Sequence, residues 1–211
     1  MGIEERRQRE RDEVREKILD GARDLFVELG YEGVTMRKVA ERIEYSPTTI
    51  YLYFADKEAL FQELCSTDFA RLAGIFQSVA LIPDPIERLR ACARTYTQFG
   101  IEYPNHYRLM FMAPHPVSPT EEDLAHKGNP QEDAYAFLLS IVTSAIEEGV
   151  FRPEYRDAHL VAQTLWAAVH GVISLQIAQG CESWASWAPL QQRADTMVDG
   201  ILRGLANPER L

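Results

Sequence analysis

The chain has 211 residues, of which 46% are hydrophobic, so it can bury one large or two small cores. Its formal net charge is −10, and residues 1–65 hold fifteen Asp and Glu against eleven Lys and Arg. This excess of acidic residues excludes binding of nucleic acid through an overall positive charge. Any binding of nucleic acid therefore needs a local group of Lys and Arg side chains.

The first third of the chain predicts a compact group of three helices. Residues 1–11 are densely charged and are expected to be either disordered or a helical extension. Apolar residues then recur at three- and four-residue spacing from Asp12 to Leu29, and Gly30 is the expected residue after the helix end. Thr35 caps a second helix that stops near Ile43–Glu44. Ser46-Pro47 starts a third, which runs to about Phe54.

Two short helices joined by a tight turn form the helix-turn-helix pattern, whose second helix enters the DNA major groove. Threonine hydroxyls and methyls suit base edges, whereas tyrosine hydroxyls and lysine ammonium groups suit phosphate oxygens. The arginines of residues 1–11 could add contacts in the minor groove. The expected DNA-binding residues are Thr35, Arg37, Lys38, Ser46, Pro47, Thr48, Thr49, Tyr51, Tyr53 and Lys57.

Residues 18–61, ILDGARDLFVELGYEGVTMRKVAERIEYSPTTIYLYFADKEALF, closely resemble the DNA-binding domain of the tetracycline-repressor family. The marks are Leu29-Gly30-Tyr31, the Thr35 cap, Thr49-Ile50-Tyr51 and Lys57-Glu58-Ala59-Leu60. One residue departs from the family pattern, which has glycine in the turn where this chain has Glu44. A residue other than glycine there either takes a strained positive φ or bends the turn differently.

Beyond the helix-turn-helix the sequence predicts helices throughout, because no strand-like alternation is present. The fold class is therefore all-α, with an arm at 1–11, a DNA-binding domain at 12–60 and an effector-binding and dimerisation domain at 61–211. Asn105 is expected to cap a short helix, and residues 113–130 read as a loop. The other expected helices cover Lys57–Val79, Pro85–Tyr103, Glu132–Glu148, Asp157–Gln179 and Pro189–Leu205.

The last two helices are expected to pair with those of a second copy as a four-helix bundle. A helix-turn-helix protein usually works as a dimer, since a palindromic operator mirrors a twofold axis, and the family resemblance implies the same. Gly171 and nearby alanines allow close helix approach. The expected interface residues are Val169, Ile173, Leu190, Ala194, Met197, Val198, Ile201 and Leu205.

Large adaptable side chains between the head and these helices suit an apolar cavity for a small apolar or aromatic effector, with His170 as a polar anchor. The alternative for each residue is ordinary core. The candidates are Tyr96, Phe99, Tyr103, Met110, Phe111, Phe137, Trp166 and His170. The run Trp166-Ala-Ala-Val-His170-Gly171, with Pro104 to Phe111, further resembles a C-terminal subtype of the family defined by a Trp…His-Gly run.

Enzyme, metal and membrane functions are disfavoured. The five histidines occur singly, with no HExxH, GxSxG or phosphate-loop pattern, so we expect no catalytic residue, metal or cofactor. No uninterrupted apolar run approaches 18 residues, and Cys65, Cys92 and Cys181 are widely spaced, which favours a reducing, cytoplasmic setting. The function expected is a homodimeric repressor that an effector releases from a palindromic operator. The alternative is a helix-turn-helix dimer that senses no small molecule and acts through architecture or a protein partner.

Overall fold

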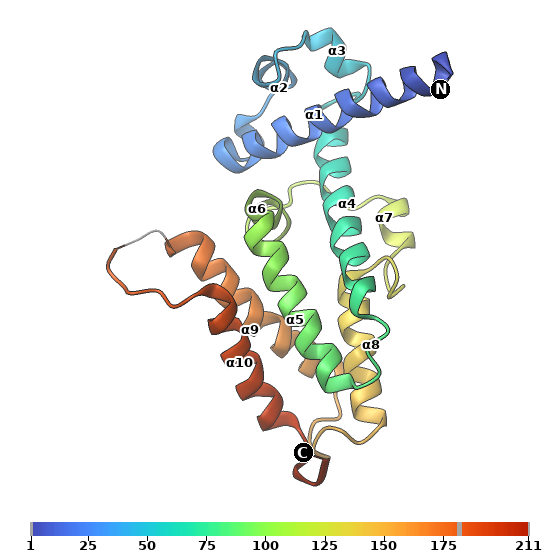
Figure 1. Cartoon of the computed structure of the whole chain (residues 1–211). Coiled ribbons are helices and arrows are strands. Elements are labelled where there is room, and N and C mark those ends of the chain that lie inside the picture. Colours follow the sequence, from blue (N-terminus) through green and yellow to red (C-terminus); the bar gives the residue numbers. More distant parts are fainter. Residues whose placement is uncertain (1, 181–182, 211) are drawn as a thin grey trace. The chain divides into compact units, whose positions relative to one another are not determined.

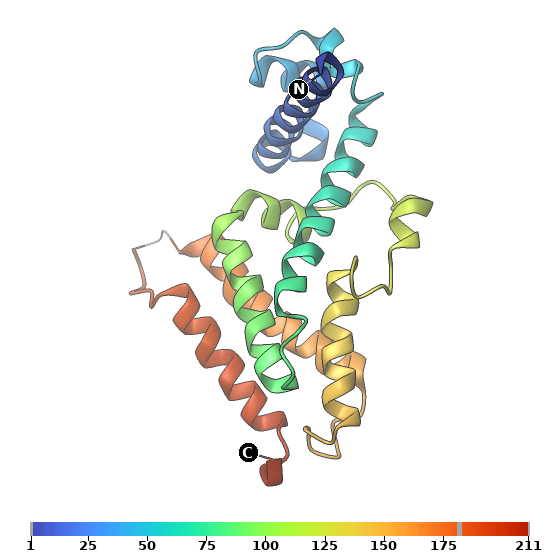
Figure 2. The same ribbon diagram turned by 45° about the vertical axis from the view of Figure 1, so that its right-hand side comes forward.

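A computed structural model describes residues 2–180 and 183–210, so Cys181 lies outside the described residues. The all-α prediction is confirmed: within the described ranges the only β interaction is one bridge between Phe151 and Ala206. Figures 1 and 2 show the helices. They are α1 (Ile3–Gly33), α2 (Met36–Arg42), α3 (Pro47–Tyr51), α4 (Lys57–Phe76), α5 (Pro85–Glu102), α6 (Pro104–Phe111), α7 (Glu121–Ala125), α8 (Ala134–Glu147), α9 (Ala158–Gln179) and α10 (Leu190–Leu205), with 3₁₀ turns at Gln77–Val79 and Pro208–Arg210.

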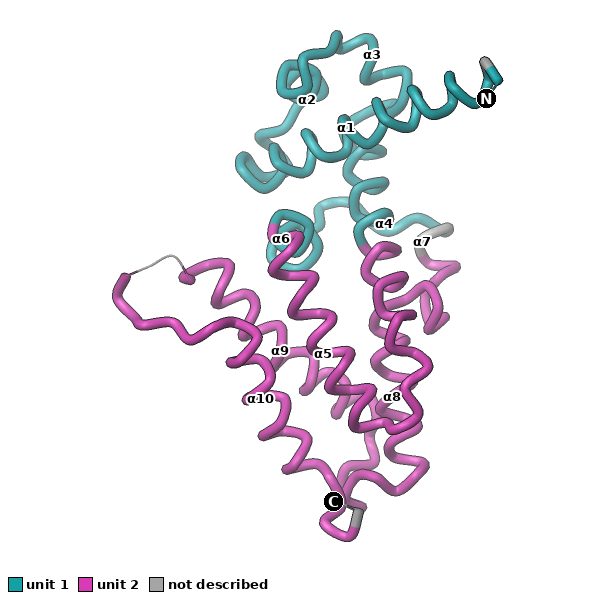
Figure 3. The backbone as a smooth tube through the Cα atoms, in the orientation of Figure 1, with its two compact units in different colours: residues 1–68, 105–121 teal, residues 69–104, 122–211 magenta. Residues whose placement is uncertain are grey.

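The chain divides into two compact units (Figure 3). The head unit consists of residues 1–68 and 105–121, and the C-terminal unit of residues 69–104 and 122–211. This division differs from the boundary expected after residue 60, because α4 contributes to the head as far as Asp68. It also assigns α6 to the head unit, although only Tyr103 separates α6 from the last residue of α5.

Helix α1 begins nine residues before the expected start at Asp12. Its first turns carry no apolar stripe, and pairs four residues apart support them: the Arg6 side chain donates to Glu10, and that of Gln8 donates to Asp12, each at 2.8 Å. The helix is interrupted at Gly30, whose φ of +68° is open to glycine at little cost. Residues 3–11 are therefore a helical extension of α1.

A buried ionic cluster joins three helices of the head unit. Asp68 on α4 is fully buried and accepts two hydrogen bonds from the Arg23 guanidinium of α1, at 2.9 and 3.0 Å. Nδ1 of His106, on α6, lies 2.9 Å from the same carboxylate and donates to it, since a carboxylate only accepts. Burial alone lowers the pKa of Arg23, but its hydrogen bonds and charge pairing with Asp68 and Asp20 outweigh that effect and raise it.

Helix α6 belongs to the head through further contacts. The Asn105 side chain donates to the Asp24 carboxylate of α1 at 2.8 Å, and α6 begins at Pro104, so Asn105 is not the helix cap that the sequence suggested. Leu109 is buried in the same hydrophobic cluster as Phe26, Ile50 and Leu64. The segment expected to be all loop, 113–130, contains the short helix α7.

In the C-terminal unit, α5 packs against α8, α9 and α10. Asp84, Asp133 and Asp157 accept hydrogen bonds from backbone N–H groups at the first turns of α5, α8 and α9, as expected of N-cap residues. Helix α9 buries only one side in the single chain, because Leu160 is 60% exposed and Leu175 is 44% exposed. The uncovered side therefore leaves apolar surface without a partner in this chain.

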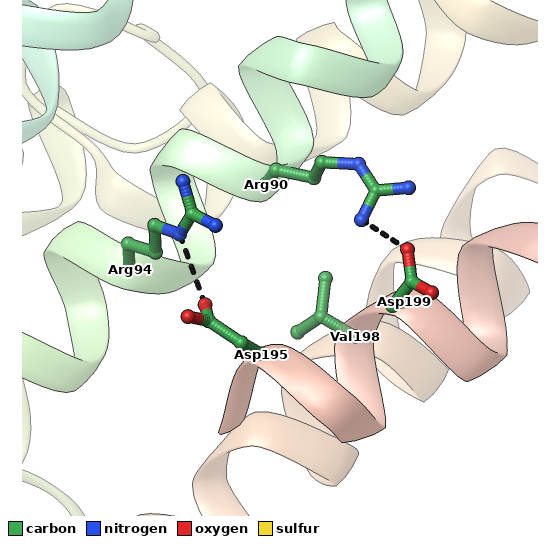
Figure 4. A pocket seen from close by; sticks show the side chains of 5 residues that line it. All are labelled: Arg90, Arg94, Asp195, Val198 and Asp199. Atoms are coloured by element: carbon green, nitrogen blue, oxygen red, sulfur yellow. Dashed lines mark hydrogen bonds and ion pairs between the residues drawn. The ribbon is translucent and has the colours of Figure 1, made fainter. Parts of the chain in front are cut away.

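Two ion pairs clamp α10 to α5 around a small pocket (Figure 4). Arg90 donates to Asp199 at 2.5 Å and Arg94 donates to Asp195 at 2.9 Å, with Val198 between them. Hydrogen bonding from Arg90 is the main cause that lowers the pKa of Asp199. These pairs fix α10 so that its apolar stripe faces its own chain.

Asp68→Ala is expected to lower the free energy of unfolding by about 3 kcal/mol, because it leaves the Arg23 guanidinium buried without its main partner. The matched control is Asp20→Ala, since Asp20 binds the same guanidinium at 2.6 Å but its side chain is 68% exposed. Urea unfolding measures both variants. Equal losses would contradict the assignment of the stabilisation to the buried carboxylate.

Candidate functional site

The turn between α2 and α3 depends on an unusual backbone conformation at Glu44. Its φ is +60°, the only positive φ at a non-glycine residue in the described chain. Tyr45 N–H donates to Ala40 C=O at 2.9 Å, which closes the turn. Of the two possibilities weighed from the sequence, the chain therefore takes the positive φ, and α3 follows α2 at the separation a helix-turn-helix needs.

Helix α3 is capped as predicted. The Ser46 hydroxyl accepts from Thr49 N–H at 3.1 Å, and the two side-chain oxygens lie 2.8 Å apart. Helix α3 ends at Tyr51, three residues before the expected end, because the chain tightens into turns in which Leu52 N–H bonds to Thr49 C=O. Ile50 is fully buried, whereas Thr48 and Tyr51 are exposed on the opposite side. With the exposed Pro47, they are the side chains that α3 presents outward.

The expected cations around α3 are largely engaged within the head. The Arg37 side chain pairs with Glu41 at 2.9 Å. Lys38 Nζ donates to Gly33 C=O at 2.7 Å, and Thr35 caps α2 by accepting from the Lys38 N–H. Lys57 Nζ donates to Tyr31 C=O at 2.9 Å and lies 4.1 Å from the centroid of the Tyr31 ring. Lys57 is thus an anchor of the last turn of α1 as well as a candidate phosphate contact.

Aromatic side chains gather in the core of the C-terminal unit. The Phe76 and Phe137 rings stack with centroids 5.5 Å apart, and Tyr96 lies 6.4 Å from Phe76. Trp166 Nε1 donates to the Tyr96 hydroxyl at 3.1 Å, which gives this apolar cluster one polar pair. Phe137 and Tyr96 are each 4% exposed. We call Phe76, Tyr96, Phe137 and Trp166 the aromatic cluster.

The other expected effector residues are divided between the units. Phe99, Tyr103 and His170 belong to the C-terminal unit, whereas Met110 and Phe111 lie on α6 in the head unit. The Phe99 and Tyr103 rings are 5.5 Å apart. Burial lowers the pKa of His170, so its imidazole is neutral at neutral pH and can both donate and accept.

Five residues expected at the dimer interface are buried within their own chain: Val169, Ile173, Ala194, Val198 and Leu205. Leu190, Met197 and Ile201 are half-buried. The uncharged face that is exposed lies on the other side of α9; we call it the α9 face, formed by Leu160, Thr164, Ala167, Gly171 and Leu175. The periodicity of the sequence identified the apolar stripe of α10, most of which is covered by its own chain. The exposed apolar surface lies instead at the small residues of α9.

Comparison with known proteins identifies the family. The profile of the bacterial regulatory proteins of the tetR family matches residues 18–64. That of the tetracyclin repressor-like C-terminal domain matches residues 89–201, more than half of the chain. The chain belongs to the tetR family. The predicted family, with its helix-turn-helix head and helical C-terminal domain, is confirmed, and the Trp…His-Gly subtype stays a prediction.

The relatives that match the head alone, and those that match most of the chain, are named as transcriptional regulators. The repressor AcnR of Corynebacterium diphtheriae is 43% identical over 68 residues, 32% of this chain and 36% of AcnR, so this match spans about a third of the relative's length. The activator FasR of Mycolicibacterium smegmatis is 26% identical over 168 residues, 79% of this chain and 70% of FasR. FadR of Bacillus subtilis, solved in complex with stearoyl-CoA, has the same fold, with a TM-score of 0.71 at 16% identity over 90% of this chain and 98% of FadR.

Helix α9 is long and apolar enough to cross a membrane by length and composition. Its buried residues, however, pack within the C-terminal unit against α5, α8 and α10. The whole of α9 also lies within residues 89–201, which the tetracyclin repressor-like C-terminal domain profile matches.

Glu44→Gly is expected to raise the free energy of unfolding by about 1 kcal/mol, because glycine adopts a positive φ without the Cβ clash that strains other residues. The matched control is Glu44→Ala, which removes the same carboxylate but keeps the Cβ. Thermal unfolding compares the two. A gain of the same size in Glu44→Ala would mean that the charge of Glu44, not its backbone, carries the cost.

Proposed function

We propose that this regulator is a cytoplasmic, homodimeric repressor that binds a palindromic DNA operator and is released by an effector molecule with an apolar part. The observation that carries the proposal is the pair of exposed α3 side chains, Thr48 and Tyr51, held by the Ser46 cap and the Glu44 turn. A rigid helix that presents hydroxyl groups outward is suited to reading base edges. Arg37, Lys38 and Lys57 supply phosphate contacts beside it.

The α9 face supports the dimer. Its uncharged side chains, with glycine and alanine at the centre, allow a second α9 to approach closely, and an exposed apolar stripe of this length favours a partner. On α10, Met197 and Ile201 are half-buried and Gly200 is exposed, so these residues are further candidates for the interface. Two heads related by a twofold axis then bind two half-sites about one DNA turn apart.

Selection of binding duplexes from random DNA tests the DNA-binding dimer, and an inverted repeat is expected. Gly171→Asp should convert the protein to a monomer and weaken operator binding, because it places a carboxylate in an apolar interface. Gly171 has open space around its Cβ position in the single chain, so the fold tolerates the substitution. Gly74→Asp, at an equally open helical glycine on α4, is the control. A Gly171→Asp protein that sediments as a dimer would move the interface away from α9.

The aromatic cluster supports an apolar effector. Its stacked rings offer apolar surface, and the Tyr96 hydroxyl with Trp166 Nε1 offers a polar pair that can orient a ligand. The likeness to FadR, solved with stearoyl-CoA, favours a long acyl chain over a small aromatic molecule. Such a ligand must bind the conformation that cannot bind DNA more tightly than the DNA-binding conformation. It then shifts the equilibrium between these two conformations by the difference between its binding free energies.

Stearoyl-CoA is therefore expected to release the selected operator duplex. Phe137→Trp should abolish this response without weakening DNA binding, because an acyl chain would have to enter between the packed rings of the aromatic cluster and the larger side chain would block it. Leu81→Trp, at a position that is 92% exposed, is the control and should respond like the wild type. Fluorescence anisotropy of the labelled duplex measures both. Undiminished release from Phe137→Trp would place the effector outside the aromatic cluster.

A further inference from the structure

The head carries more acidic than basic residues but must attract the DNA polyanion, and its cations near α3 are mostly engaged in contacts within the head. Arg37 pairs with Glu41, and the Arg42 guanidinium binds the Glu28 carboxylate through two hydrogen bonds. The ammonium groups of Lys38 and Lys57 each donate to a backbone carbonyl. Phosphate contacts supply essentially all of the non-specific affinity of DNA-binding proteins and a large share of the specific affinity. A second source of positive charge beside α3 would therefore matter more here than in a basic protein.

The N-terminal turns of α1 provide such charge in a defined position. The guanidinium carbon of Arg11 lies 5.9 Å from the centroid of the Tyr53 ring, just past the end of α3. One turn later, the Arg15 guanidinium lies 5.8 Å from the Phe54 ring and donates to Glu63 of α4. These contacts fix the register of α1 against the α3–α4 corner. In Figure 1 the N-terminal end of α1 projects beyond that corner.

Arg7 continues this line outward. Residues four apart lie about 40° from one another around a helix, so Arg7 and Arg11 share one face, and Arg7 lies about 6 Å further out along the axis. Both side chains are exposed, and neither forms an ion pair with any described residue. Arg6 and Arg9 occupy the other side of the helix, where Arg6 is bound to Glu10.

The nearby carboxylates form no salt bridge with either arginine within the described residues. Of the five acidic residues between Glu4 and Glu13, Glu10 is ion-paired with Arg6, and Glu5 and Asp12 accept hydrogen bonds from the Gly2 N–H and the Gln8 side chain. Because the extension is helical, the backbone positions of Arg7 and Arg11 are fixed, so these residues lose less backbone freedom on binding than those of a flexible arm.

We infer that the first turns of α1 are a second DNA-binding element, in which Arg7 and Arg11 bind phosphates of the backbone beside the major groove that α3 enters. The inference rests on the proposed function and extends it to a surface outside the helix-turn-helix. Guanidinium groups bind phosphate oxygens through paired N–H donors. Contacts of this kind add affinity and register but do not read the sequence.

The test compares three double variants on the selected operator duplex, with the dissociation constant measured across a series of KCl concentrations. Arg7→Ala/Arg11→Ala should flatten the slope of log K against log salt by about 0.9 for each lost contact, roughly three to four for two heads. Arg7→Lys/Arg11→Lys should keep most of the slope. Arg6→Ala/Arg9→Ala, with the same number of charges removed from the other side, should change it little.

The ratio of affinities for selected and scrambled duplexes should remain unchanged in Arg7→Ala/Arg11→Ala, because phosphate contacts are blind to sequence. A wild-type slope in that variant would overturn the inference, as would an equal loss in Arg6→Ala/Arg9→Ala. These results would leave the proposed function intact. A wild-type protein that selects no DNA sequence would instead overturn the proposed function, and this inference with it. Circular dichroism confirms that each variant keeps its helix content.

Discussion

One buried carboxylate determines how the head unit is assembled. Asp68 is removed from water, so its charge is tolerable only with donors around it, and these come from α1 through Arg23 and from α6 through His106. The positions of three helices are thereby tied to one point. The bond from Asn105 to Asp24 adds a second tie between α6 and α1. A helix that follows α5 almost directly in sequence is in this way part of the DNA-binding head.

Local signals in the sequence determined most of the helices. Capping residues such as Thr35, Ser46 and Asp157 act on backbone groups within the next turn, so their effect can be read without knowing the fold. The start of α1 was missed because pairs between charged side chains, not an apolar stripe, support its first turns. Membership of α6 in the head was also missed, since it depends on contacts with residues more than thirty positions away.

In the candidate sites, too, the sequence did not show which residues are covered by other parts of the chain. Periodicity identified Ala194 and Val198 as members of an apolar stripe, but it cannot say whether a stripe is covered by the same chain or by another. Here α5 covers it, with Arg90 and Arg94 bound to the acidic residues at its edge. Exposed small residues on α9 were the complementary signal. Similarly, the sequence shows that Lys57 is a cation that could bind phosphate. Only the structure shows that its ammonium group also donates a hydrogen bond to the Tyr31 carbonyl of α1.

The discontinuous head also limits how this protein can be cut and recombined. The family profile for the head ends at residue 64, which invites chimeras made by exchanging the first 60 to 70 residues between relatives. Such a graft would carry Arg23, and Asp68 only if it reaches that residue, whereas His106 and Leu109 would come from the recipient. The transplanted head would meet a foreign α6 across a buried charge. A functional exchange of DNA specificity therefore requires residues 105–121 to travel with the head.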